Sequence, residues 1–152
     1  MPAENLLGPL HGGWNVALSS LQHERQMIWI MNWVEIMRGL DSVRSARPTD
    51  DACAELGSLL ADAEALRATG YRALGNELAG RASPEADIMK LLGSTTLQRV
   101  WELGAAVAGP RSAADPDLLF ERQDALAATI YGGTSEVQRN IIAERVLGLP
   151  KG

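Results

Sequence analysis

The chain has 152 residues, of which 46% are hydrophobic and 22% are charged, and its formal net charge is −5. This length and apolar content suit one domain with a real core, and they exclude a disordered chain; no long uncharged run suggests a membrane span. The acidic balance argues against nucleic acid or an anionic membrane as the main partner, and one cysteine with two histidines leaves little material for a disulfide or a metal site.

Residues 1–13 are rich in Gly and Pro and are expected to form a linker that enters a helix. They lack a basic region followed by an apolar one, so no signal peptide is predicted and we expect a cytoplasmic protein. From Trp14 to about Arg38 there is neither Pro nor Gly. Helical spacing predicts one apolar face made of Trp14, Ala17, Leu21, Ile28 and Met31. Residues 27–34 are apolar nearly all round, which predicts burial on most sides or pairing with another subunit.

The rest of the chain predicts four more helices. Residues 39–48 are expected to break the first helix, and a second helix runs from about residue 50 to 78. Ser83-Pro84-Glu85 is typical of a helix start with Ser83 as the N-cap, and this third helix reaches about residue 107. Shorter helices are expected over residues 118–130 and 135–147. Because no apolar alternation indicates a strand, the predicted fold is an all-α, up-and-down helical bundle over residues 14–152.

Glu24 lies inside the apolar face of the first helix, three residues after Leu21 and four before Ile28. We expect a carboxylate at this position to be buried, which would raise its pKa and suit it to general-base catalysis. The alternative is a structural glutamate paired with Arg25 or with an arginine of another helix. Spacing alone favours this alternative, because structural ion pairs are common.

A second candidate is the segment 131–138, Tyr-Gly-Gly-Thr-Ser-Glu-Val-Gln. Its two glycines permit close backbone approach and unusual dihedral angles. Ser135 and Gln138 have the spacing of a capping box, which predicts a helix start whose free N–H groups could hold an anion or a polar cofactor edge. The alternative is an ordinary joint between two helices, which a bare Gly-Gly pair favours.

Both ends of the chain resemble one family. The residues from Tyr131 to Pro150 closely resemble the C-terminal signature of flavin-dependent acyl-CoA dehydrogenases. Residues 2–8, followed by Gly12-Gly13-Trp14, resemble the junction between that family's middle β-domain and its C-terminal helical domain. Residues 21–25 resemble the segment that opens the first helix of the helical domain. The resemblance implies that the linker, residues 1–13, leads from a β-domain that this sequence does not contain.

The resemblance implies α,β-dehydrogenation of an acyl-CoA thioester in fatty acid metabolism, with FAD as hydride acceptor and an electron-transferring flavoprotein as electron carrier. Family members place the catalytic base at one of two positions, which are Gly132 and Glu24 here. Glycine cannot act as a base, so the resemblance assigns catalysis to Glu24. Thr134, Ser135 and Glu136 match the segment that contacts FAD. The positions that would contact substrate are Arg25, Tyr131, Gly132 and Gly133.

Two elements that reach the FAD of a neighbouring subunit in the family differ here. Residues 44–48, Arg-Ser-Ala-Arg-Pro, lack the family's Phe-Gly, and residues 104–110 lack its Gly-Gly-x-Gly-Tyr. One hypothesis is therefore the C-terminal domain of an acyl-CoA dehydrogenase with Glu24 as base, inactive and without retained FAD as an isolated fragment. The other is a non-catalytic assembly subunit of a heteromeric acyl-CoA dehydrogenase. Both predict a homo- or hetero-oligomer, because the apolar face around Trp29 and Trp33 needs cover.

Overall fold

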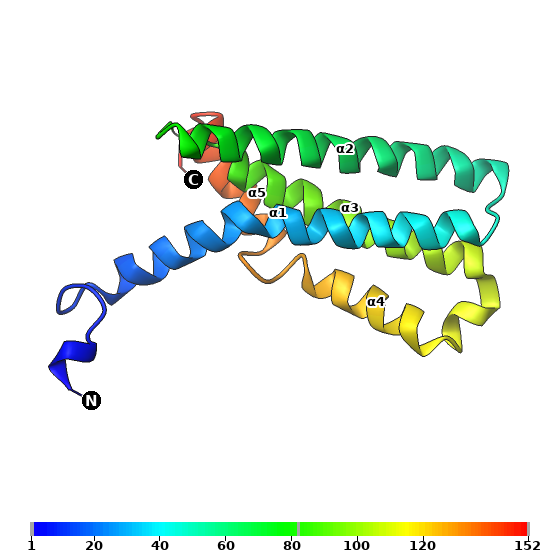
Figure 1. The fold of residues 1–152 in the computed structure, drawn as a ribbon, viewed down its shortest axis with the longest axis horizontal. Coiled ribbons are helices and arrows are strands. Elements are labelled where there is room, and N and C mark those ends of the chain that lie inside the picture. Colours follow the sequence, from blue (N-terminus) through cyan, green and yellow to red (C-terminus); the bar gives the residue numbers. More distant parts are fainter. Residues whose placement is uncertain (1, 82, 152) are drawn as a thin grey trace.

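The computed structural model describes residues 2–81 and 83–151, except for the side chains of Gln22, His23, Arg25 and Ala86. Three long helices, α1 (Gly13–Ser45), α2 (Asp50–Leu78) and α3 (Glu85–Ala108), run along the long axis of the molecule (Figure 1). The part of the chain that is described holds no strand, and consecutive long helices run in opposite directions. The prediction of an all-α, up-and-down bundle is confirmed.

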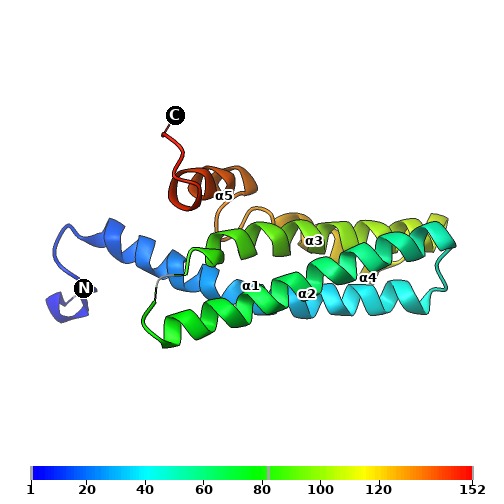
Figure 2. The same ribbon diagram turned by 90° about the horizontal axis from the view of Figure 1, so that it is seen from above.

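The smaller elements lie around this three-helix frame. Helix α4 (Pro116–Ala127) packs on α3, and the 3₁₀ helix η2 (Gly109–Ala113) connects the two. Helix α5 (Ser135–Ile141) continues into a π-helical turn, η3 (Ile142–Val146), and both stand off one side of the bundle beside α3 (Figure 2). A further 3₁₀ turn, η1 (Ala3–Asn5), precedes α1.

No helix in the described ranges is both long enough and apolar enough to cross a membrane.

Polar side chains fix where the helices begin. The Thr49 hydroxyl accepts a hydrogen bond from the first turn of α2, and the Asp115 carboxylate accepts two from the first turn of α4. Helix α2 has the predicted bounds. The predicted N-cap of α3 was wrong: Pro84 is the cap residue, and the Ser83 hydroxyl donates instead to Glu85 Oε2 at 2.6 Å.

Two glycines allow the long helices to approach each other closely. Helix α1 continues through Gly39, where the sequence predicted a break. Gly39 is buried, and a Cβ there would lie 2.4 Å from Val100 Cγ1 on α3. A Cβ on Gly70 of α2 would lie 2.3 Å from the Trp29 ring on α1. These glycines serve helix packing, so the predicted break at residue 39 was wrong.

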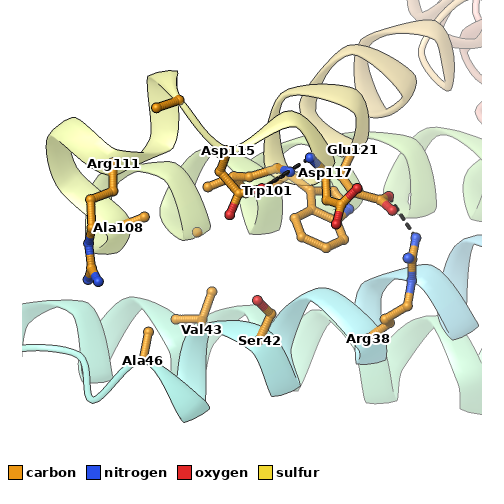
Figure 3. Close-up of a pocket in the computed structure, with 13 residues that line it drawn as sticks. Arg38, Ser42, Val43, Ala46, Trp101, Ala108, Arg111, Asp115, Asp117 and Glu121 are labelled. Carbon is orange, nitrogen blue, oxygen red and sulfur yellow. Dashed lines mark hydrogen bonds and ion pairs between the residues drawn. The ribbon is translucent and has the colours of Figure 1, made fainter.

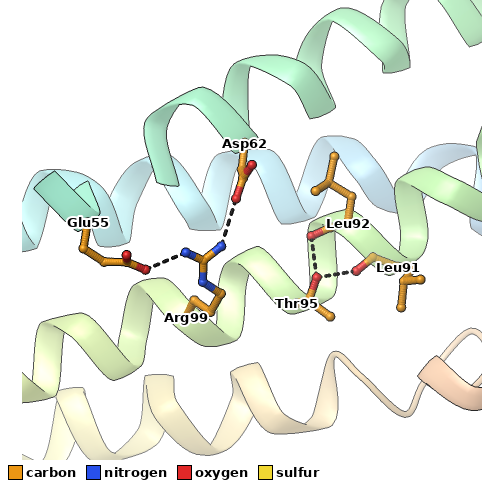
Figure 4. Close-up of polar contacts among 6 residues, drawn as sticks. All are labelled: Glu55, Asp62, Leu91, Leu92, Thr95 and Arg99. Carbon is orange, nitrogen blue, oxygen red and sulfur yellow. Dashed lines mark hydrogen bonds and ion pairs between the residues drawn. The ribbon is translucent and has the colours of Figure 1, made fainter. Parts of the chain in front are cut away.

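The apolar core lies where α1, α2 and α3 meet. Its fully buried members include Ile36, Leu59, Ala63, Leu66, Met89 and Val100. On the outer surface, Arg99 of α3 pairs with Glu55 at 2.6 Å and with Asp62 at 3.0 Å on α2 (Figure 4). The threonine Oγ1 of Thr95 donates back to the Leu91 carbonyl within α3. Burial of apolar side chains holds the three helices together, and the ion pairs lie at its rim.

The N-terminal part of α1 extends beyond the ends of α2 and α3 (Figure 1). The predicted apolar face is therefore wrong in this part: Trp14 is 74% exposed, Leu21 and Met31 are also exposed, and only Ile28 is buried. Helical periodicity identifies a face but not the length of helix that a neighbour covers.

Two of the three tryptophans of α1, Trp29 and Trp33, belong to the core. Trp29 is buried and meets the Tyr71 ring edge-on at 5.6 Å, and Trp33 is partly buried against the core cluster. The two indole rings are therefore covered, whereas apolar residues beside them on α1 remain exposed. The exposed large apolar side chains of this region are Leu6, Leu7, Leu10, Trp14, Leu18, Leu21, Met27, Ile30, Met31 and Val34.

Candidate functional site

The connection between α4 and α5 forms a tight turn against α1 and α3. Gly132 has φ +67° and Gly133 has φ +108°, which side chains rarely permit. The Tyr131 N–H donates to the Ala127 carbonyl at 3.1 Å, and the Ser135 N–H donates to the Thr129 carbonyl at 3.1 Å. These two hydrogen bonds close the loop around the glycines, and we call residues 131–133 the glycine turn.

Glu24 lies beside the glycine turn, as the family resemblance implied. A Cβ placed on Gly132 would lie 3.7 Å from Glu24 Oε1, 3.5 Å from Ile28 Cδ1 and 3.9 Å from Lys90 Cε. The structure thus brings α1, α3 and the turn together at one point. The prediction that Glu24 is buried was wrong, because its side chain is exposed.

Gln138 holds the other side of the glycine turn. Its side chain is fully buried, and Nε2 donates to the Gly132 carbonyl at 3.3 Å. The φ of Gly133 favours glycine at this position, and a Cβ there would lie 2.6 Å from the same nitrogen and would displace the Gln138 amide. The turn is therefore fitted closely to Gln138.

The start of α5 was predicted correctly, but its cap was not. Thr134 is the N-cap, and its hydroxyl accepts from the Val137 N–H at 3.4 Å. Ser135, predicted as the cap, is the first helical residue, and its buried hydroxyl has no hydrogen-bond partner. Gln138 Oε1 is a second buried oxygen without a partner. One of these two unsatisfied atoms, the Ser135 hydroxyl, lies in the segment predicted to contact FAD, and the other lies three residues further along α5.

Hydrogen bonds at the start of α5 favour an ionised Glu136. Its own backbone N–H and the Thr134 hydroxyl hold the pKa of the Glu136 carboxyl below its usual value, and the charges of Arg139 and Lys90 lower this pKa further. At Tyr131, partial burial raises the pKa of the phenol, and nearby carboxylates including Glu24 add to the rise. The phenol therefore remains neutral at physiological pH.

Lys90 is a site residue that the sequence reasoning missed. The side chain is fully buried in α3, and Nζ donates to the Ala128 carbonyl at the end of α4, at 3.2 Å. Burial lowers the pKa of this ammonium, and Glu136 partly opposes the effect. The sequence did carry a signal for a buried charge, because Lys90 is the only charged residue between Asp87 and Arg99. Gln138, also missed, carried no comparable signal.

Arg25 was predicted to contact substrate, and its side chain lies outside the described residues. Its backbone lies in α1 one residue after Glu24.

A cavity of about 780 Å³ lies elsewhere, between α1, α3 and α4 (Figure 3). Arg38 projects into it over the Trp101 ring, with 5.5 Å between the guanidinium carbon and the ring centroid, and pairs with Glu121 at 2.6 Å and with Glu35. Arg38 lies fourteen residues along α1 from Glu24, which corresponds to about 21 Å of helix. This cavity therefore does not adjoin the glycine turn.

The two elements that differ from the family pattern, residues 44–48 and 104–110, lie at the ends of α1 and α3. Arg44 pairs with Asp41 at 2.8 Å within the last turns of α1. Residues 104–108 complete α3, and Gly109 ends the helix with φ +61°. Among the described residues, no group of three or more His, Cys, Asp or Glu side chains could hold a metal ion.

Comparisons with known proteins agree on one family. Residues 11–147 match the family described as acyl-CoA dehydrogenase, C-terminal domain. The acyl-CoA dehydrogenase IpdE1 of Mycobacterium tuberculosis is 35% identical over 98% of this chain, which spans only 41% of that relative. The chain thus spans about two-fifths of the length of this curated relative.

Solved structures share the fold. Glutaryl-coenzyme A dehydrogenase in its glutaryl-CoA complex superposes with a TM-score of 0.87 at 19% identity, covering 99% of this chain and 42% of that chain. The ChsE4-ChsE5 complex of Mycobacterium tuberculosis superposes with a TM-score of 0.83 at 24% identity, covering 100% of this chain and 45% of that chain. At these identities the likeness establishes the helical fold.

Proposed function

The chain belongs to the acyl-CoA dehydrogenase family, whose C-terminal domain it matches, and we propose that Glu24 is the catalytic base of the complete enzyme. The observation that carries this proposal is the position of the Glu24 carboxylate beside Gly132, with Oε1 3.7 Å from the site of an absent Cβ. The family resemblance gives position 132 as the alternative site of the base. A carboxylate from α1 therefore reaches the neighbourhood that a side chain at position 132 would occupy.

The proposed reaction is the α,β-dehydrogenation of an acyl-CoA thioester. The Glu24 carboxylate removes a proton from the α-carbon, and the electron pair of that C–H bond becomes the new α,β double bond as a hydride leaves the β-carbon. FAD, when bound, accepts this hydride. The glycine turn presents no side chains to the carboxylate at Gly132 and Gly133, which leaves room for the thioester end of a substrate.

The residues at the start of α5 fit a polar cofactor edge. The Ser135 hydroxyl and Gln138 Oε1 are buried without partners, so a bound group could satisfy them without displacing an existing hydrogen bond. Thr134 and Glu136 flank Ser135 at the surface of the same turn. We propose that Thr134, Ser135 and Glu136 hold FAD in the complete protein, and that an electron-transferring flavoprotein receives its electrons.

The test is Glu24→Gln in the full-length protein in its native assembly. Glutamine keeps the shape of the side chain but cannot accept the α-proton, so dehydrogenation should fall at least about a hundredfold. The flavin absorbance per protein should stay unchanged. Glu35→Gln, on the same helix beside Arg38, is the matched control and should keep its activity within about twofold. Comparable activity in Glu24→Gln and the control would refute the assignment.

A second candidate is an assembly subunit of a heteromeric acyl-CoA dehydrogenase. Residues 44–48 lack the family's Phe-Gly, and residues 104–110 lack its Gly-Gly-x-Gly-Tyr, with residues 104–108 forming the end of α3 instead. The chain therefore lacks the motifs that reach a neighbour's flavin in the family. The structural likeness to the ChsE4-ChsE5 complex is consistent with pairing of unlike chains. A purified native assembly should then contain fewer flavins than subunits, and one flavin per subunit would contradict this candidate.

A further inference from the structure

The ammonium of Lys90 lies in an environment that is costly for a charge. The side chain has no exposed surface, and no ion pair joins it to a carboxylate among the residues whose side chains are described. Its hydrogen bond, at 3.2 Å, goes to the neutral carbonyl of Ala128. An apolar side chain of similar shape would avoid the cost of desolvating a charge here. Folding stability therefore does not explain why a lysine occupies this position.

The contacts of Lys90 point to the glycine turn. Ala128 is the C-cap of α4, where the helix dipole favours a cation, and the chain enters the turn three residues later. Lys90 Cε also lies 3.9 Å from the point where a Cβ on Gly132 would stand. The same side chain thus holds the entry of the loop through Nζ and packs against the turn through its stem.

The hydrogen bonds that fix the loop from α4 to α5 come both from within the loop and from other helices. The Lys90 ammonium donates to Ala128, the Ser135 N–H donates to Thr129, and Gln138 Nε2 donates to Gly132. The bond from Lys90 is the one that comes from α3, and α3 belongs to the main core. It therefore ties the position of the loop to the rigid part of the bundle.

We infer that Lys90 is a positioning residue: its buried ammonium holds the Ala128–Gly133 loop so that the glycine turn faces Glu24. The inference rests on the proposed function for its consequence in catalysis, but the placement of the loop is a separate physical claim. A loop displaced by about 1 Å from a reacting geometry can reduce a rate by about a hundredfold. Lys90 would therefore affect the reaction without touching the substrate.

The experiment compares Lys90→Met with Leu59→Ala in the full-length protein in its native assembly. Methionine keeps an unbranched stem and removes both the charge and the donor. We expect kcat to fall at least about tenfold with flavin content unchanged, and backbone hydrogen exchange in residues 128–135 to accelerate at least about tenfold. The Tm should stay unchanged or rise, because a buried charge has been removed.

Leu59→Ala is the matched control, since Leu59 is also fully buried but lies in the α2 part of the core. It should lower the Tm and leave both kcat and exchange in residues 128–135 within about twofold of the wild type. A Lys90→Met variant that behaves like this control would overturn the inference. Hydrogen exchange reports the loop even if Glu24 is not the base, so failure of the proposed function and failure of this inference give different results.

Discussion

The two ends of the bundle differ in what they bury. The end that contains the α1–α2 connection, which we call the closed end, buries apolar side chains such as Ile36, Leu59 and Val100. The end that contains Glu24 and the glycine turn, which we call the open end, buries the polar side chains of Lys90 and Gln138 beside apolar ones such as Met89, and it leaves large apolar side chains exposed. Apolar burial stabilises a fold, whereas buried polar groups and exposed apolar surface are typical of sites and interfaces. The comparison indicates that the closed end provides stability for a site at the open end.

The largest expected effect lies in the core of the closed end. Leu59→Ala should lower the free energy of unfolding by about 2–5 kcal/mol, because it removes a fully buried side chain and leaves a cavity. Its neighbour Leu60 is 45% exposed, and Leu60→Ala should cost about 1 kcal/mol or less. Denaturant unfolding of both variants measures the difference. Equal losses would show that the closed end is not the stabilising core.

The next effect tests how closely the helices approach where the two ends meet. Gly70→Ala should destabilise by about 1–3 kcal/mol, because its Cβ would lie 2.3 Å from the Trp29 ring. Gly75 is in the same helix, and a Cβ there meets nothing within 4 Å. Gly75→Ala should therefore stabilise by about 0.5–1 kcal/mol through helix propensity. Thermal unfolding of the pair would contradict this account if both changes had the same sign.

These glycines also show what the sequence could and could not predict. Helix α2 was predicted with its observed bounds, because Pro48, two aspartates and a regular apolar stripe mark its start and face. The predicted break at Gly39 was wrong, because the sequence alone does not distinguish a glycine that allows close helix packing from one that ends a helix. Only the position of Val100 on another helix distinguishes the two cases.

The candidate site divides in the same way. Local patterns predicted the start of α5 and a turn at Gly132 and Gly133. The family resemblance gave Glu24 and position 132 as alternative sites of the catalytic base. The burial of Glu24 was predicted wrongly, because burial depends on where α2 and α3 end relative to α1. Lys90 and Gln138 were missed because their roles arise from contacts across the fold. Tertiary contacts of this kind have no fixed spacing in the sequence.

A smaller effect is expected at the outer rim of the closed end. Arg99 pairs with Glu55 and Asp62 between α3 and α2, and all three side chains are partly exposed. A double-mutant cycle with Arg99→Ala and Asp62→Ala should give a coupling free energy of about 0.2–1 kcal/mol. The coupling should shrink in 1 M salt, where the screening length is about 3 Å. A larger, salt-independent coupling would mean that this rim, and not only the core, stabilises the closed end.

The smallest expected effect lies at the open end and depends on pH. The Ser83 hydroxyl, the backbone N–H of Glu85 and the charge of Arg72 hold the pKa of the Glu85 carboxyl below its ordinary value. A lowered pKa in the folded state stabilises above the unfolded pKa of about 4.3, and this contribution disappears as the pH falls through the lower folded value. Ser83→Ala should raise the pKa of Glu85 and slightly reduce stability at neutral pH.

Titration of Glu85 by NMR and unfolding between pH 2 and 7 would measure both consequences of Ser83→Ala. The stability difference between the variant and the wild type should vanish once Glu85 is protonated in both, in the acid range below about pH 4. In a Glu85→Gln background, Ser83→Ala should have no pH-dependent effect, because the titrating group is gone. A pH dependence that survives in that background would assign the acid response of the open end to another carboxylate. Glu136, whose pKa is also lowered by hydrogen bonds from Thr134 and from its own backbone, would then be the next group to test.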